Sequence, residues 1–496
     1  MKQALWAVLL TLPAWAMAET APPLPEQPQA EPELRLNTAQ PEVAAVQQKP
    51  AAAGQVAQRV LEVDEAMLLQ NPALLSRAMQ SAVMEQNTAG IKVLLPIYKK
   101  WPQHDVQLAE LGRALVAQAE GRAKEAVGIY RAMIAEYPDA AAIRFRLAQA
   151  LFDDRQNEAA ADQFERLGSE NLPEPVREMV EKYREALRQR DTVQVYAGVS
   201  VSRDSNINQA PESRQLGGYL NEAQCAYMRQ ENPDDDCWRG WTFDAPIDAA
   251  GINYQAGIEK KWSLPGGWYT KAGADVYGKY YPSYGRYNDT TARVSAGVGY
   301  ADQRNDAGLT PFHERRIYGN DAYSYSNGVR LHWNHWWLPR LQSLQALELG
   351  RLKNMQRLRS DNDNRLLSGS LVFYRNARQS WLLGADVYQE RNDEDKGDNF
   401  NRFGVRAAWG QEWPKGISTR LSAGYAQRRY QTPSFLSEGV KRRDKEWNAS
   451  LSLWHRALHF GGVTPRFTIS RLRTQSNDAF YSHGKTRSFI ELNKAF

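Results

Sequence analysis

Two histidines and a glutamate form one candidate site for metal binding in the sequence. His332 and His335, with Glu314, offer imidazole and carboxylate groups, which are common ligands of transition metals. The pattern H-x-x-H, however, places the two rings on opposite faces when the segment is a strand. The sequence therefore favours a role for both rings as aromatic anchors beside the neighbouring tryptophans over a metal site.

Two further sets of residues are weaker candidates. A calcium loop is suggested only loosely by three aspartates, which lack the glycine and the distal glutamate of such loops: Asp393, Asp395 and Asp398. A Ser–His hydrolase needs a serine close to a histidine, and the candidates are His455, Ser452 and Ser470. No catalytic motif surrounds them. The sequence thus predicts no metal, no cofactor and no enzyme, and an enzyme built on a barrel is kept as an alternative.

The N-terminus has the pattern of an export signal. Lys2 precedes an apolar stretch, and Ala16-Met17-Ala18 fits a signal-peptidase site, so residues 1–18 are predicted to be a signal peptide. Residues 19–55 are rich in Pro, Glu, Gln and Ala, which predicts a disordered linker. The net charge of +5 is small for 496 residues and, together with export, argues against a nucleic-acid partner.

The two cysteines of the chain, Cys225 and Cys237, lie in one long polar segment. Export places them in an oxidising compartment, where a disulfide is the favoured state and two free thiols are the alternative. Closing so short a loop would stabilise the fold by about 3 kcal/mol in the chain-entropy model. We expect this disulfide to be structural.

Residues 56–190 have the spacing of a short tetratricopeptide-like array. Leu, Ala and aromatic residues recur at helical intervals. Pro102, Pro138 and Pro173 stand 36 and 35 residues apart, close to the period of about 34 for this repeat. Small residues let the two helices of a hairpin approach, and the proline ends the second helix. An array of helical hairpins without tetratricopeptide geometry is the alternative.

The first helix of each repeat is expected to line a concave face that binds an extended peptide or a partner. The candidate client-binding residues on this face are Arg113, Val116, Phe145, Gln149, Phe152 and Asp153. For the two phenylalanines, packing between helices is an equally good explanation. A helix from Glu174 to Gln189 would cap the array and lead into the next domain.

Residues 191–496 alternate apolar and polar side chains in segment after segment. Trp447, Ala449, Leu451 and Leu453, for example, would share one face of a strand. About fourteen such segments predict an antiparallel outer-membrane β-barrel, because each spanning strand needs only about ten residues and half of these face the lumen. Twelve of the fifteen tryptophans follow position 237, which suits the aromatic girdles of such barrels. A soluble lectin-like β-protein is the alternative.

The connections predict which end of the barrel faces which compartment. An even number of strands places both ends of the barrel sequence at one membrane face. Short turns such as 265–267 should face the periplasm, and long polar loops such as 203–250 should face outward. The helical domain is then periplasmic. The predicted strands are 192–202, 251–263, 267–280, 288–303, 306–318, 321–338, 340–356, 364–378, 380–391, 400–414, 416–430, 444–458, 460–474 and 485–496.

The chain is thus predicted to be an α-plus-membrane-β protein, and its organisation resembles the Slam family, the surface lipoprotein assembly modulators. The segment V-S-V-S-R-D-S-N-I-N, residues 199–208, is similar to the opening strand of that family. The resemblance implies an outer-membrane translocator that delivers client proteins, either surface lipoproteins or a secreted haem- or iron-acquisition protein, to the cell surface.

Other partners expected are outer-membrane lipid, the barrel assembly machinery and periplasmic chaperones. The rival function is that of a tetratricopeptide-barrel porin that exports a polysaccharide. Such a porin normally has a longer helical array, and its lumen needs a strong stripe of one charge matched to the polymer.

Overall fold

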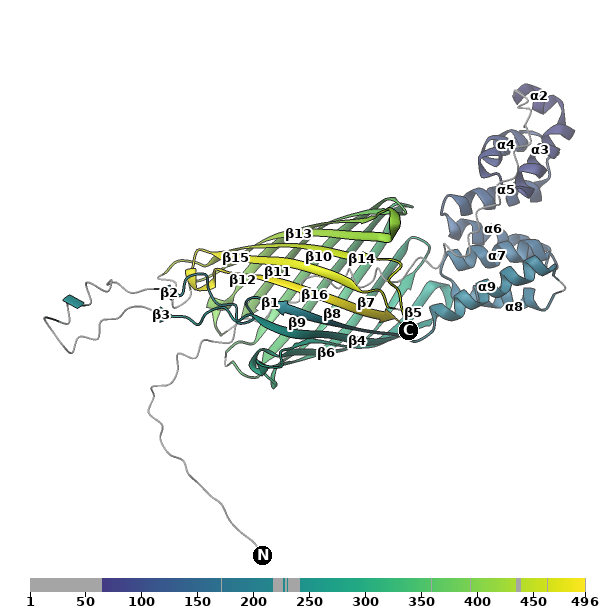
Figure 1. Cartoon of the computed structure of the whole chain (residues 1–496). Coiled ribbons are helices and arrows are strands. Elements are labelled where there is room, and N and C mark those ends of the chain that lie inside the picture. Colours follow the sequence, from purple (N-terminus) through teal and green to yellow (C-terminus); the bar gives the residue numbers. More distant parts are fainter. Residues whose placement is uncertain are drawn as a thin grey trace, which may run out of the picture.

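The structure, a computed structural model, consists of a column of helices joined to one end of a β-barrel (Figure 1). It describes residues 65–170, 172–216, 226–227, 230, 241–357, 359–392, 394–433, 439–461 and 463–495. The predicted signal peptide and linker lie outside these residues, as do Cys225, Cys237 and Asp393.

Eight helices precede the barrel within the described part of the chain. They are α2 (Glu65–Gln70), α3 (Pro72–Met84), α4 (Thr88–Lys100), α5 (Val106–Ala119), α6 (Ala123–Glu136), α7 (Ala141–Asp153), α8 (Asn157–Gly168) and α9 (Glu174–Arg190). The pairs α3–α4, α5–α6 and α7–α8 form successive hairpins, and α9 packs on α8. In the residues that the structure describes, no helix is both long and apolar enough to cross a bilayer.

Side-chain caps and one glycine explain where these helices begin and how closely they pack. Asp105 starts α5 because its carboxylate accepts hydrogen bonds from the backbone N–H groups of Gln107 and Leu108 at 2.8 and 3.2 Å. Within α5, a Cβ at Gly112 would lie 2.5 Å from Cε of Met79. Glycine at this position therefore leaves room for the Met79 side chain of α3 beside α5.

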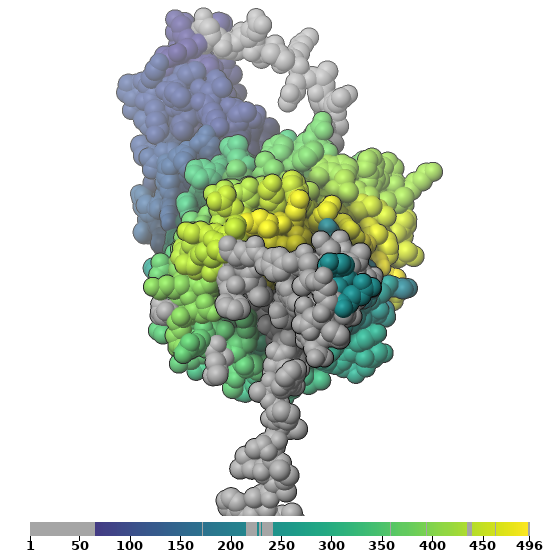
Figure 2. All heavy atoms as spheres, turned by 90° about the vertical axis from the view of Figure 1, so that its left-hand side faces the viewer, coloured from purple at the N-terminus to yellow at the C-terminus, as the bar shows by residue number. Residues whose placement is uncertain are grey.

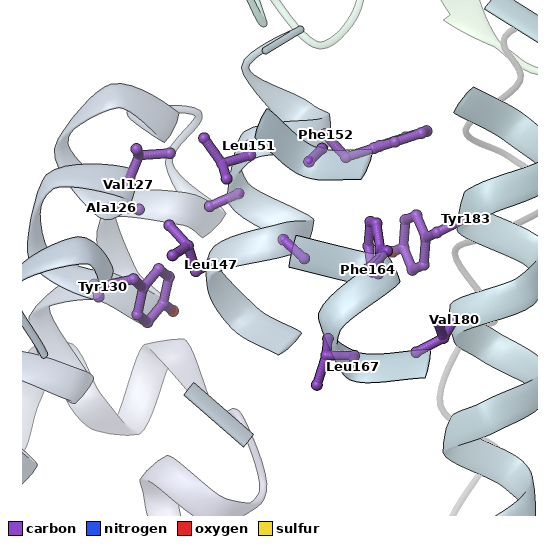
Figure 3. Packing of buried hydrophobic residues seen from close by; sticks show 14 of the residues in the cluster. Ala126, Val127, Tyr130, Leu147, Leu151, Phe152, Phe164, Leu167, Val180 and Tyr183 are labelled. Atoms are coloured by element: carbon purple, nitrogen blue, oxygen red, sulfur yellow. The ribbon is translucent and has the colours of Figure 1, made fainter. Parts of the chain in front are cut away.

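Aliphatic and aromatic side chains together form the core of the half of the array nearest the barrel (Figure 3). Phe164 of α8 is fully buried and stacks on Tyr183 of α9, with the ring centroids 4.9 Å apart. Such pairs contribute about 0.5–1.5 kcal/mol beyond the area that they bury. The helix α9 therefore caps the array, as its sequence predicts.

The barrel is closed and antiparallel, and its fourteen strands confirm the predicted fold class. Each strand pairs with its neighbours in sequence, and β1 closes the ring by pairing with both β4 and β16. The strands are β1 (Gln194–Asp204), β4 (Ala249–Ser263), β5 (Trp268–Tyr280), β6 (Asp289–Ala301), β7 (Asn305–Tyr318), β8 (Asp321–Leu338), β9 (Leu341–Asn354), β10 (Asn362–Asn376), β11 (Gln379–Asn392), β12 (Phe400–Glu412), β13 (Ile417–Tyr430), β14 (Arg443–His455), β15 (Arg466–Ser476) and β16 (His483–Ala495).

Two local features differ from the strand predictions. The strand predicted from residue 460 begins only at Arg466, because the chain turns at Gly461, whose φ is +57°, and Pro465 follows. Within the long loop after β1, β2 (Gln215–Leu216) pairs with β3 (Trp241–Thr242) as a small separate sheet.

Candidate functional site: the helical array, its joint with the barrel, and the lumen

The two histidines considered as metal ligands lie on opposite faces of β8, as the strand geometry predicts. His332 points into the lumen, with its Nε2 3.5 Å from Oδ1 of Asp306. His335 points outward, and its Nδ1 is hydrogen-bonded to Oδ1 of Asn305 at 2.8 Å. Among the described residues, no group of three or more His, Cys, Asp or Glu side chains is arranged to hold a metal ion.

The described aspartates of the calcium-loop candidate have local structural partners. Asp395 accepts a hydrogen bond from the backbone of Gly397 at 2.9 Å and so caps the short helix η5 (Lys396–Asp398). Asp398 lies 4.0 Å from Arg357. Burial raises the pKa of Asp398 above its ordinary value. These two carboxylates therefore organise the loop between β11 and β12.

The serine and histidine candidates do not come together. Ser452 and Ser470 point into the lumen, where Ser452 is hydrogen-bonded to Thr468 at 2.9 Å. His455 lies on the outward face at the end of β14, and its Nε2 is hydrogen-bonded to the carbonyl of Lys415 at 2.8 Å. A proton relay between this histidine and either serine is therefore not formed.

A network of polar side chains connects the helices α5, α7 and α9 along one face of the array. Gln118 donates to Asp153 at 3.0 Å, which links α5 to α7. Gln149 accepts from Arg146 at 3.0 Å and donates to the hydroxyl of Tyr183 at 3.1 Å, which links α7 to α9. Burial raises the pKa of the Asp153 carboxyl. The first helices of successive repeats therefore share a continuous face, and Gln149 and Asp153 lie on it.

The other four predicted client-binding residues differ in exposure. Arg113 is exposed and forms an ion pair with Glu110 at 2.8 Å. Val116 and Phe152 are 9% and 1% exposed and belong to the core. Phe145 is half-buried and packs edge-on against aromatic rings of α8 and α9. Arg113 is therefore accessible at the surface, whereas Val116 and Phe152 support the array from within.

The turn between α5 and α6 contacts the turn between β6 and β7, which forms the first half of the joint between array and barrel. Lys124 Nζ lies 3.0 Å from Asp302 Oδ2, and Arg304 Nη2 donates to the carbonyl of Glu120 at 2.6 Å. Gly121 has a φ of +70°, and a Cβ there would lie 2.8 Å from Arg304. Burial acts to raise the pKa of Asp302, but hydrogen bonds from the Arg304 backbone and from Lys124 outweigh it and lower that pKa.

The second half of the joint lies where α8 and α9 meet the periplasmic end of β4. Asn157 donates to Ser263 Oγ at 2.8 Å, and this hydroxyl donates to Asp191 Oδ1 at 2.7 Å. Lys260 donates to the carbonyl of Asp191. Arg190, only 8% exposed, donates to Asn157 Oδ1 at 2.7 Å. The array is therefore attached at two turns on one side of the periplasmic rim. In a view from the extracellular end, the array is seen behind the barrel and extends past one side of it (Figure 2).

The lumen contains arginines that are paired with carboxylates. On β11 to β14, Asp386 lies 2.6 Å from Arg402 and 3.2 Å from Arg406. Glu446 lies 2.8 Å from both Arg402 and Arg428. Each inward carboxylate of this group therefore bridges two guanidinium groups.

A second group of charges crosses β6 to β9. Arg293 lies 2.9 Å from Glu348 and 3.9 Å from Glu314, and its guanidinium is 3.6 Å from the ring centroid of Phe312. Arg330 lies 3.7 Å from Glu348. Because positive and negative groups alternate around this part of the lumen, they do not form a stripe of a single charge.

The closure of the barrel has its own buried charges. Asp204, 2% exposed, lies 2.9 Å from Arg487 and 3.7 Å from Lys485 across the β1–β16 pair. The same carboxylate accepts a hydrogen bond from the backbone of Asn206 at 3.1 Å. These contacts secure the extracellular end of the strand pair that closes the ring.

Sequence reasoning did not identify the residues of the joint. Asp302 and Arg304 lie in a short polar turn, and Lys124 and Asn157 lie in the first turns of α6 and α8. Charged and polar residues at such places usually have no long-range partner. The sequence did contain one indication of a contact: these residues lie at the ends of helices and strands that were all expected to face the periplasm.

Comparisons with known proteins agree with this architecture. A family model described as "Surface lipoprotein assembly modifier" matches residues 194–496, and one described as "Surface lipoprotein assembly modifier, N-terminal TPR repeats" matches residues 61–164. The chain is 52% identical to "Surface lipoprotein assembly modifier 1" of Neisseria meningitidis serogroup B, over 98% of this chain and 96% of that protein.

Two other relatives extend the comparison. The chain is 42% identical to "Surface lipoprotein assembly modifier" of Moraxella catarrhalis, over 89% of this chain and 84% of that protein. It is 26% identical to "Hemophilin secretion modulator" of Acinetobacter baumannii, over 86% of each chain. These matches confirm the resemblance seen in the sequence: the chain belongs to the surface lipoprotein assembly modifier family.

Proposed function

We propose that this protein delivers client proteins, either surface lipoproteins or a secreted haem- or iron-acquisition protein, from the periplasm to the cell surface. Its barrel lies in the outer membrane, and its helical array lies on the periplasmic side. The observation that carries the proposal is the joint, which holds a peptide-binding type of array at the periplasmic rim of a closed barrel. A client bound to the array is thereby held close to the barrel. It must then pass either through the barrel or beside it.

The lumen charges favour this function over the export of an acidic or basic polysaccharide. A charged polymer needs a lumen with an excess of one sign along its path. Here the inward arginines of the two groups described above face carboxylates at 2.6–3.9 Å. The short array of three helical hairpins and a cap also favours a protein client.

We assign client capture to the face formed by α5, α7 and α9. Arg113 of α5 supplies an exposed cation, and Gln149 and Asp153 of α7 supply polar groups. Val116, Phe145 and Phe152 would act through packing. The proposal further includes residues 1–18 as the export signal, residues 19–55 as a linker, and the barrel assembly machinery and periplasmic chaperones as transient partners.

A charge reversal with a matched control tests this assignment. Arg113→Glu should lower surface display of a co-expressed client several-fold, because it repels acidic groups that Arg113 would bind. Arg166→Glu is the control: Arg166 is also an exposed helical arginine with a carboxylate partner, Asp162 at 3.0 Å, but it lies on α8. Equal display by both variants would reject the assigned face.

Deletion of the array tests the function itself. A barrel that starts at Thr192 and keeps the signal peptide should insert in the outer membrane but display much less client. Display is measured by antibody labelling of intact cells, and insertion by the heat-modifiable migration of the folded barrel. If the isolated barrel displays client as well as the full chain does, selection belongs to the barrel and the proposed role of the array is wrong.

A further inference from the structure

Two arginines on β15 face the membrane side of the barrel. Phe467, Ile469, Arg471 and Arg473 share one face of this strand, because side chains alternate along it. Arg471 is the sixth of the eleven residues of β15, so it lies midway along the strand. A cation on the lipid-facing surface is unfavourable in proportion to its depth. Its presence at this position therefore calls for an anionic partner.

A groove runs along the outer face of the barrel next to Arg471. Ala407, Ala423 and Ala449 lie in one row, because they are paired in register on β12, β13 and β14, and the next residue of the row is Arg471. The small side chains leave two adjoining cavities of about 870 and 650 Å³, and both include Leu383, the three alanines and Arg471. We call this set of residues the outer groove.

Aromatic side chains lie on both sides of the outer groove. Tyr425 and Trp447, with ring centroids 4.3 Å apart, lie two residues from the alanine row toward the extracellular end. Trp381 and Trp409, 6.2 Å apart, lie two residues from it toward the periplasmic end. Aromatic side chains therefore flank the groove on both sides along the strands. Arg473 is the register partner of Trp447 and therefore lies on the extracellular side of the alanine row.

Each arginine is held by one neighbour and keeps donors for another acceptor. Arg471 donates to Thr486 Oγ1 at 2.8 Å, and Arg473 donates to Glu212 Oε2 at 3.3 Å. A guanidinium group has five N–H donors, so these contacts use only part of its capacity. A Cβ at Gly484 would lie 3.2 Å from Arg471 Nη2, so glycine at this position leaves room beside that guanidinium.

We propose that the outer groove binds a phosphorylated glycolipid with several acyl chains from the outer leaflet. The acyl chains lie side by side across the alanine row, and phosphate oxygens accept hydrogen bonds from Arg471 and Arg473. Arginine suits this role because its planar fork matches phosphate geometry. The groove extends over five strands, β11 to β15, or about 19 Å at the usual strand spacing, which accommodates several chains side by side. The acyl anchor of a lipoprotein has no phosphate and would leave Arg471 without an anion.

The barrel offers a matched control arginine. Arg351 of β9 also points outward toward the extracellular end, and it lies 3.9 Å from Asp363. It lies outside both cavities of the outer groove. An effect of general surface charge should therefore appear on substitution of Arg351, whereas an effect of the proposed site should not.

Native mass spectrometry of the full chain in detergent tests the proposal, with bisphosphorylated hexa-acyl lipid A as the probe. We expect the double variant Arg471→Ala, Arg473→Ala to lower its affinity at least tenfold, and Arg351→Ala to change it less than twofold. Ala449→Phe fills the groove without removing a charge and should lower the affinity for both lipid A and its dephosphorylated form. Heat-modifiable migration verifies that each variant is a folded barrel.

Three results would overturn the proposal. If dephosphorylated lipid A binds as tightly as lipid A, the arginines do not bind phosphate. Phosphatidylglycerol that binds as tightly as lipid A, with the same dependence on the arginines, would remove the assignment to a glycolipid. A triacylated cysteine peptide that binds more tightly than lipid A would assign the groove to a lipoprotein anchor instead.

Discussion

Replacing Arg190 by alanine should loosen the helical array at its junction with the barrel. Arg190 Nη1 donates to the carbonyl of Phe152 at 3.0 Å and to Asn157 Oδ1 at 2.7 Å. Its guanidinium lies 3.5 Å from the ring centroid of Phe152. Because Arg190 is only 8% exposed, its loss leaves these acceptors without their charged donor in a region that water reaches poorly.

The expected magnitude follows from these three contacts. Each hydrogen bond to a charged group contributes about 1.5–3 kcal/mol, and the contact with the aromatic ring contributes about 1 kcal/mol. Contacts made by one side chain are not additive, so the free energy of unfolding of the array should fall by roughly 3–5 kcal/mol. For an array of this size, 1 kcal/mol corresponds to about 4 °C, which gives a decrease in Tm of roughly 12–20 °C.

The assay is thermal unfolding of the full chain in detergent, with hydrogen exchange of α7–α9 followed by mass spectrometry. Arg188→Ala is the control, because the Arg188 side chain is 60% exposed and pairs with Glu185 on the same helix, so its shift should stay below about 2 °C. Arg190→Lys should be intermediate, since lysine keeps the charge but lacks the planar fork. A decrease of less than about 3 °C for Arg190→Ala would refute this reasoning.

Three further predictions concern the joint and the extracellular loop. Gly121→Val should increase hydrogen exchange at the α5–α6 turn at least tenfold, because valine disfavours a positive φ and would crowd Arg304; unchanged exchange would contradict the joint as described. The lowered pKa of Asp302 means that its ionised form stabilises docking above about pH 4 and that this contribution is lost as the pH falls through the lowered pKa. Exchange at the β6–β7 turn should then stay constant from pH 8 to 5 after correction for intrinsic rates and rise below about pH 4, and Asp302→Asn should abolish that step. Replacing Cys225 and Cys237 by serine should leave the heat-modifiable barrel intact if their disulfide only stiffens a loop, and loss of the folded barrel would contradict this.

The alternation of side chains along single strands was enough to predict the barrel. Trp447, Ala449 and Leu451 reveal by spacing alone that they share a face, because a strand turns over every second residue whatever surrounds it. The same rule separated His332 from His335. In the helical region, the positions of the prolines predicted the hairpins, because proline ends a helix through its own backbone.

The sites depend on contacts that no local pattern contains. Val116 and Phe152 have the spacing of groove residues and of core residues alike, and only the packing of neighbouring helices places them inside. The joint likewise requires Arg304 to meet Glu120 across 184 positions of sequence. The alternation of side chains along the strand already places Arg471 on the outward face. Its position at the end of the alanine row, however, depends on the register of four strands. Sequence determines the face of each element because the backbone repeats locally; the tertiary structure decides which faces meet, because register and docking are set by residues far apart in the chain.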